Sequence, residues 1–339
     1  MEELYVWRGI ACLVLADAVR RFTKFCFEHS NPKQESMRFA ALADQEGNGG
    51  RAEETHRVLG DPKWTASFFV NKQNLRIFRR RWAPQDKAIA SVVLVHGYTE
   101  HSGRYEGVAE SLRARGFLVV ALDHQGHGRS EGTRAYVERF DHYVDDVVTL
   151  ARECPKPLFV VGHSMGGLIA LLAAYRLRKE LAGVVSLAPP VIPLPPPSLP
   201  LVTISKFMSR VLPKARLPAT LPSDSVTGDA QNVHALLNDP LVYQGPYKAR
   251  WADEIFCAMA SAKCQLRTSF PVPLCLHHGT RDTAVPVESS KTWYADLADD
   301  CVDRSFHLHD GLFHELLFEP NGRGDAIFNA ILDWLKRRV

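Results

Sequence analysis

From about residue 65 onward, short apolar runs alternate with segments of helical spacing. Several runs consist almost entirely of Val and Leu, which is typical of strands that are covered on both faces. The segments between them suit crossover helices. The expected strands lie at residues 67–70, 76–82, 91–95, 117–123, 158–161, 184–188, 273–277 and 305–308. The pattern therefore predicts an α/β fold with an early hairpin, a mostly parallel central sheet and helices on both faces.

The proline content changes abruptly between residues 189 and 222, where 34 residues include ten prolines. No central strand can continue through such a segment, because proline lacks the amide that a strand ladder needs. We therefore expect an insertion over residues 189–256, dividing the core into 63–188 and 257–339. Its apolar residues indicate a cap, or lid, over an apolar substrate, with an ordinary packed excursion as the alternative.

The first 62 residues differ from the rest of the chain. Apolar residues recur at helical spacing within residues 4–25, beside basic ones, so 1–30 is expected to form an amphipathic extension. Charged residues interrupt it too often for a membrane span, and the acidic start is unlike a secretory signal. This amphipathic extension is expected either to contact a membrane surface or to pack on the core of the protein. Residues 31–62 are polar and Gly-rich, as in a linker.

Composition narrows the classes of function. The 41 Lys and Arg against 38 Asp and Glu give a net charge of +3, which excludes nucleic acid as the main partner. The seven cysteines include no CxxC pair, which disfavours a disulfide framework and a zinc site. We expect a reducing, cytoplasmic location and leave peripheral membrane association open.

The strongest chemical motif is Gly162-His163-Ser164-Met165-Gly166-Gly167. It follows an expected strand directly and precedes a helical segment, the context of a nucleophile elbow. Glycines are needed around Ser164 because this tight turn leaves no room for side chains. The helix that begins at Met165 would direct its first amides toward a developing oxyanion.

A serine nucleophile needs a histidine base and a group that orients it, in the chain order Ser, Asp, His. Asp282 follows a strand directly and is therefore favoured over the aspartates near residue 300. His314 lies in a loop after the last strand and is the expected base, with His309 held in reserve. His277 and Asp282 also match an H-x-x-x-x-D acyltransferase pattern, which we interpret as coincidence.

A second oxyanion amide is expected from the loop after the strand at 91–95. His96 and Gly97 allow the backbone to turn, so that the amide of Tyr98 faces the nucleophile. The polar loop 123–132 is expected to support the rim of the site. Its two histidines, at 124 and 127, lack a third ligand of sensible spacing, so no metal is expected.

Basic residues also occur inside the insertion, among apolar ones. A surface that mixes apolar and basic residues is typical of contact with anionic lipids. The alternative is that these basic residues only face solvent. The residues are Lys206, Arg210, Lys214 and Arg216.

Six motifs over residues 65–337 resemble the monoacylglycerol lipase and lysophospholipase-like family of α/β-hydrolase serine hydrolases, which is related to plant caffeoylshikimate esterases. They are HGYTEHSGRY (96–105), DHQGHGRSEG (123–132), GHSMGG (162–167), NDPLV (238–242), GTRDTAVP (279–286) and HELLFE (314–319). The resemblance implies a Ser164, Asp282 and His314 triad, oxyanion amides at Tyr98 and Met165, a cap over an acyl-chain tunnel, and no cofactor. Animal members resemble HGAGEHSGRY at the first motif, so Tyr98 and Thr99 crowd a position that is small there.

The sequence therefore predicts a serine hydrolase that cleaves a monoacylglycerol ester through an acyl-enzyme on Ser164. The nearest alternatives are a lysophospholipase and a hydroxycinnamoyl esterase of the caffeoylshikimate type. Acyl transfer through the same intermediate is a further alternative. The last is a ligand receptor on this scaffold without catalytic activity, which the intact triad disfavours. The expected partner is a small lipid ester, with membrane contact through the cap and residues 4–25 left open.

Overall fold

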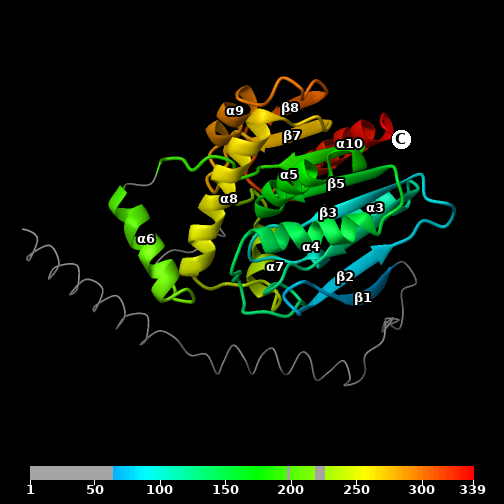
Figure 1. Ribbon diagram of the computed structural model, residues 1–339. Helices are drawn as coiled ribbons and strands as arrows, with labels where there is room; N and C mark the ends of the chain where they lie inside the picture. Colours follow the sequence, from blue (N-terminus) through cyan, green and yellow to red (C-terminus); the bar gives the residue numbers. More distant parts are fainter. Residues whose placement is uncertain (1–63, 197–198, 218–225) are drawn as a thin grey trace, which may run out of the picture.

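The computed structural model describes residues 64–196, 199–217 and 226–339 (Figure 1). The expected amphipathic extension at 1–30 and linker at 31–62 lie outside these residues, and so does the proposed membrane contact of residues 4–25. Within the described residues, no helix is both long and apolar enough to cross a bilayer.

An eight-stranded sheet is the centre of the described part of the chain, in the order β1-β2-β4-β3-β5-β6-β7-β8. The first two strands form the predicted hairpin, and β2 pairs antiparallel with β4. All later pairings are parallel, which confirms the mostly parallel α/β sheet. The strands are β1 (Thr65–Val70), β2 (Arg76–Trp82), β3 (Ala90–Val95), β4 (Phe117–Leu122), β5 (Leu158–His163), β6 (Gly183–Leu187), β7 (Leu274–Gly279) and β8 (Arg304–His309).

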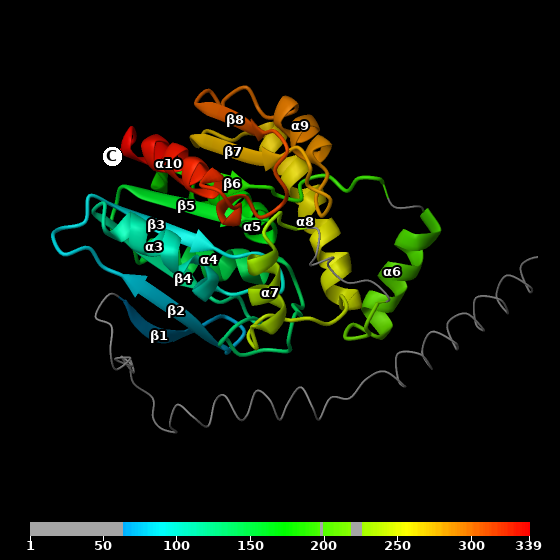
Figure 2. The same ribbon diagram turned by 180° about the vertical axis from the view of Figure 1, so that it is seen from behind.

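Every residue of β3, β4, β5, β6 and β7 is buried, because helices cover both faces of the sheet. Figures 1 and 2 show α4, α5 and α8 on one face and α3 and α10 on the other. The α-helices are α3 (Glu106–Arg113), α4 (Asp141–Arg152), α5 (Met165–Leu177), α6 (Leu199–Val211), α7 (Ala230–Asn238), α8 (Ala249–Thr268), α9 (Val287–Ala295) and α10 (Arg323–Lys336). Short 3₁₀ helices are η1 (Ser102–Tyr105), η2 (Arg178–Glu180) and η3 (Leu316–Phe318).

The segment between β6 and β7 contains three helices, α6, α7 and α8. The inner face of α8 is buried in the same core as α5 and includes Trp251, Met259 and Leu266. Helix α6 lies outside α8 and farther from the sheet (Figures 1 and 2). The segment therefore leaves the core after Val191, which is buried in it, and returns to the core along α8.

Candidate active site

Ser164 occupies the sharp turn between β5 and α5, as the sequence predicts. Its backbone has φ 55° and ψ −124°, a conformation that L-residues rarely adopt. Glycine is required on both sides of the turn. A Cβ on Gly162 would lie 2.1 Å from the carbonyl oxygen of Gly166, and a Cβ on Gly166 would lie 2.2 Å from that of Val95. The turn thus holds Ser164 at the carboxyl end of β5, directly before the amino end of α5.

Asp282 and His314 come from two different loops, which follow β7 and β8. Nδ1 of His314 lies 2.6 Å from Oδ2 of Asp282, and both side chains are almost fully buried. An imidazole whose Nδ1 hydrogen is donated to a carboxylate has Nε2 free to accept a proton. This pair therefore has the geometry of a general base and the group that orients it.

The carboxylate of Asp282 has three further polar partners. Nε2 of His278 lies 3.1 Å from Oδ2, and the amides of Ala284 and Val285 donate to Oδ1 at 2.9 and 2.8 Å. Burial alone would raise the pKa of Asp282, but the imidazole of His314 and these hydrogen bonds outweigh it and hold the pKa well below its usual range. Asp282 is therefore an anion that can stabilise a charged His314. His278 was not among the expected site residues, although it stands four residues before Asp282 on the adjoining strand.

The loop after β3 runs directly beside the nucleophile. A Cβ on Gly97 would lie 3.3 Å from the Cβ of Ser164. His96 fixes the start of this loop, because its Nε2 accepts a hydrogen bond of 2.9 Å from the amide of His124. Tyr98 follows Gly97 in this loop and lines the same cavity as Ser164.

The side chain of Tyr98 packs between its loop and α8. Its ring stacks on Trp251 with centroids 3.6 Å apart, and its hydroxyl donates to the carbonyl oxygen of Ala135 at 3.0 Å. Thr99, the next residue, has φ 71°. The Tyr98 side chain is therefore accommodated by an aromatic contact with α8.

One cavity joins the three predicted site elements. It is lined by the nucleophile, the histidine and the loop after β3, together with residues from α7 and the loop that follows it. The lining residues are Gly97, Tyr98, Thr99, Glu100, Arg104, His163, Ser164, Val226, Leu236, Tyr243, Gln244, Gly245, His314 and Glu315.

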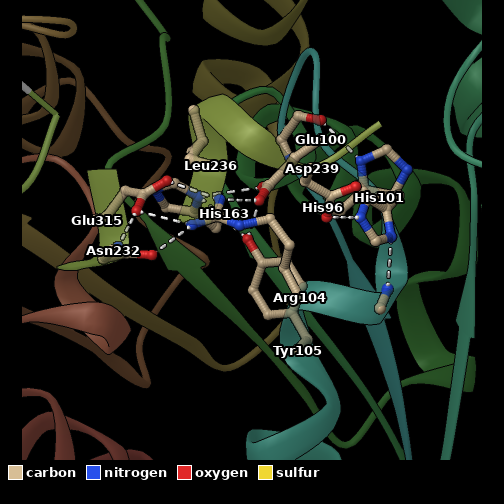
Figure 3. Close-up of polar contacts among 12 residues, drawn as sticks. His96, Glu100, His101, Arg104, Tyr105, His163, Asn232, Leu236, Asp239 and Glu315 are labelled. Carbon is tan, nitrogen blue, oxygen red and sulfur yellow. Dashed lines mark hydrogen bonds and ion pairs between the residues drawn. The ribbon is translucent and has the colours of Figure 1, made fainter. Parts of the chain in front are cut away.

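A buried ion network forms one wall of this cavity (Figure 3). Arg104 donates to both oxygens of Glu315 at 2.7 and 2.9 Å and to Glu100 at 2.5 Å. Asn232 of α7 donates to Glu315 at 2.6 Å, which links the inserted segment to the core. One guanidinium is therefore shared by two carboxylates. Sequence patterns could not reveal this network, because Arg104 and Glu315 are 211 residues apart.

His163, beside the nucleophile, connects this network to the catalytic histidine. Its Nε2 lies 3.1 Å from the carbonyl oxygen of His314, and its Nδ1 lies 3.6 Å from Glu100. Burial lowers the pKa of His163, but the carboxylate of Glu100 more than reverses this and raises it. A protonated His163 can donate from both nitrogens, which holds the backbone of His314 in place.

The remaining candidates lie elsewhere. His309, the reserve base, is on β8, where its Nε2 lies 3.0 Å from Nδ1 of His277. Neither histidine contacts Asp282 in the described hydrogen bonds, so the acyltransferase pattern has no counterpart in the geometry. In the loop 123–132, Asp123 accepts hydrogen bonds from the amides of Ser102 and Arg129, both at 2.8 Å. Loop 123–132 therefore hydrogen-bonds to the segment that follows β3, which agrees with the expected supporting role.

Comparisons with known proteins point in the same direction. A family model described as serine aminopeptidase S33 matches residues 86–321. The chain is 33% identical over 274 residues to a monoacylglycerol lipase of Mycolicibacterium smegmatis, covering 79% of this chain and 95% of that one. It is 31% identical over 278 residues to a monoglyceride lipase of Homo sapiens, covering 80% and 90%. The crystal structure of Paleococcus ferrophilus monoacylglycerol lipase superposes with a TM-score of 0.70 at 28% identity, covering 78% and 99%.

Proposed function

Since the chain belongs to the serine aminopeptidase S33 family, we propose that it is a serine hydrolase that cleaves the ester bond of monoacylglycerols. The chain has the α/β-hydrolase fold. Its similarity to monoacylglycerol lipases covers most of both chains. The match to the family model spans the segments that bear the cavity.

In the proposed reaction, Ser164 Oγ attacks the ester carbonyl while Nε2 of His314 takes its proton. The amides of Tyr98 and Met165 stabilise the oxyanion, and Asp282 stabilises the imidazolium. The imidazolium then gives its proton to the leaving alcohol, which leaves an acyl group on Ser164. Water, activated by His314, releases the fatty acid. The bond of 2.6 Å between His314 and Asp282 and their common burial support these roles.

One observation favours an uncharged glycerol headgroup over a phosphate. The polar wall of the cavity contains Arg104, whose guanidinium is already bound to the carboxylates of Glu100 and Glu315, and His163, which lies beside Glu100. Arg104 and a protonated His163 balance the two carboxylates, so this wall carries no net positive charge and each cation in it is already paired. The wall therefore gives no net attraction to an anionic headgroup, whereas glycerol hydroxyls can donate hydrogen bonds to carboxylate oxygens.

We propose further that residues 189–256 form the cap and that α6 is its contact with lipid. Ile204, Phe207 and Val211 are exposed by 44%, 52% and 57%, and they share one side of the helix. Lys206 and Arg210 flank them and are also exposed. An apolar stripe with a basic border suits the surface of an anionic bilayer, where the substrate would be found.

The proposed substrate class is tested by comparing two lipids that share one acyl chain. The value of kcat/KM is measured for a monoacylglycerol and for the matching lysophospholipid, presented in identical mixed micelles. We expect the monoacylglycerol to be preferred by at least about tenfold, because a difference of about 1.4 kcal/mol in headgroup binding is already sufficient for that ratio. A lysophospholipid hydrolysed equally well or faster contradicts the proposal. A hydroxycinnamoyl ester in the same panel checks the aromatic alternative.

A further inference from the structure

A second cluster of reactive side chains lies on β7 and β8, outside the cavity of Ser164. Sγ of Cys275 lies 3.1 Å from Nε2 of His277. The ring of His277 stacks on that of His307 with centroids 4.7 Å apart. One potential ligand atom from each of the three residues falls within 4.8 Å of the others. The three ligand atoms are therefore close enough together to be shared by one ion.

The register of the two strands produces this cluster. His277 pairs with His307, and Cys275 pairs with Ser305, in the parallel ladder. Side chains two residues apart on a strand point to the same face, so Cys275 and His277 project together. The cluster lies on the same side of the sheet as α10, where Cys275 is part of the core with Trp334. The backbone thus fixes the three side chains without help from any loop.

We propose that Cys275, His277 and His307 bind one Zn²⁺ ion. A thiolate with two imidazoles is a donor set that zinc prefers, and a water molecule completes the tetrahedron. Zinc needs ligand bonds of about 2.0–2.3 Å, so the exposed His307 ring must turn out of its near-parallel stack on His277 to bind the ion. As the bond to sulfur forms, the Cys275 thiol releases its proton to solvent. This inference is independent of the proposed ester hydrolysis.

His309 is suited to orient the first imidazole. Its Nε2 lies 3.0 Å from Nδ1 of His277, and the two rings are nearly parallel. When Nδ1 of His277 donates to His309, the lone pair of Nε2 points toward Cys275. Histidines that ligate metals usually donate their other nitrogen in this way, and the partner fixes both tautomer and ring orientation.

The position of the cluster determines the route by which the zinc ion enters and the two strands that the ion joins. Cys275 and His277 are buried, whereas His307 is exposed, so the ion reaches the site from solvent past His307. Within the described sheet, β8 is an edge strand that pairs with β7 alone. A zinc ion bound to both strands fastens β8 to β7, the strand whose following loop bears Asp282.

Zinc binding is tested on the full chain, first stripped with a chelator. The stoichiometry and affinity are measured by competition with a chromophoric chelator, and Co²⁺ is used as a spectroscopic substitute. We expect one tightly bound zinc per chain and a sulfur-to-cobalt charge-transfer band. A hundredfold excess of zinc over its Kd should raise Tm by about 5 °C.

Two variants and two matched controls locate the ion. Cys275→Ser should lose the cobalt–thiolate band, whereas Cys257→Ser, which changes an exposed cysteine of α8, should keep it. His307→Gln should weaken zinc binding at least 100-fold, whereas His234→Gln, on the exposed face of α7, should leave it unchanged.

A third variant tests the role of His309. His309→Phe retains an aromatic ring but no hydrogen bond, and should weaken zinc binding by roughly 10–100-fold without abolishing it.

Two results would overturn the proposal. One is the absence of a cobalt–thiolate band in the wild-type protein. The other is zinc binding by His307→Gln with the affinity of the wild type, which would place the ion elsewhere in the chain. If Cys275→Ser fails to fold, His307→Gln decides alone, because that side chain lies at the exposed edge of the sheet.

Discussion

The central sheet and helix α6 both contain many apolar residues, but they use them differently. Every side chain of β5 is buried between helices. On α6, Ile204, Phe207 and Val211 face outward and are 44–57% exposed. Apolar residues in the sheet therefore stabilise the fold, whereas those on the outer side of α6 are available for contact with another surface. Apolar content alone does not separate the two roles, whereas position relative to the core does.

Between the end of the sheet and α6, the largest expected difference is in the effect of substitutions on catalysis. Asp282→Asn should lower kcat on a short, water-soluble ester by about 10⁴-fold, because the amide no longer stabilises or correctly orients His314. Phe207→Ala should leave kcat on the same ester unchanged, since α6 lies outside the cavity.

Asp299→Asn, which changes an exposed aspartate, is the matched control for Asp282→Asn. Thermal unfolding checks that each variant is folded. A residual kcat above a tenth of the wild-type value in Asp282→Asn would show that another group orients the base.

The next contrast concerns stability. Phe159 of β5 is fully buried and packs edge-on against Trp334 of α10. Phe159→Ala should lower the free energy of unfolding by about 3–5 kcal/mol, because it leaves a cavity. Phe207→Ala should change it by less than about 0.5 kcal/mol. Urea unfolding measures both. Equal losses would mean that Phe207 is a core residue.

A buried carboxyl group on α4 provides a pH-dependent test of how the core differs from the exposed surface of α6. Asp146 of α4 is 2% exposed, and burial raises its pKa to about 7. The folded state therefore holds this proton more tightly than the unfolded state, in which the pKa is about 3.9. The resulting stability is fully present below pH ~4 and is lost as the pH rises through about 7.

Asp146→Asn should remove this loss, which amounts to roughly 4 kcal/mol of unfolding free energy. The unfolding free energies of the variant and the wild type are measured at several values of pH between 4 and 8, and their difference is compared. The same difference for Asp299→Asn should stay constant. A constant difference for Asp146→Asn would show that the carboxylate is already ionised in the folded protein.

The smallest expected effect is the charge contribution of α6 to lipid binding. Lys206→Glu combined with Arg210→Glu should weaken binding to anionic vesicles by about 2 kcal/mol, or roughly 30-fold at low salt. Co-sedimentation measures this. Lys336→Glu combined with Arg337→Glu makes the same charge change at the end of α10, at the opposite end of the molecule from α6 (Figure 1). Equal losses in both double variants would contradict a specific role of α6.

The sheet and the nucleophile turn could be predicted because local sequence determines both. The uninterrupted Val and Leu runs of β3, β5 and β6 are buried on both faces, as predicted. The glycines around Ser164 are required by contacts within the turn itself. In each case, a short segment contains the whole signal.

Features that depend on distant segments could not be predicted. The bonds of Arg104 to Glu315 arise only when segments 211 residues apart meet at the end of the sheet. The pairing of His277 with His307 is likewise a consequence of strand register. A search for neighbouring metal ligands along the chain does not detect such a pair, because 30 residues separate its members.

The central claim is that Ser164 forms the acyl-enzyme, and one paired measurement tests it most directly. Purified wild type and Ser164→Ala are treated with a fluorophosphonate probe, and fatty acid release from a monoacylglycerol is followed in parallel. The account predicts one label per wild-type chain, none on Ser164→Ala, and a loss of turnover of about 10⁶-fold in the variant. Labelling of Ser164→Ala at the wild-type level, with fatty acid still released, would contradict it.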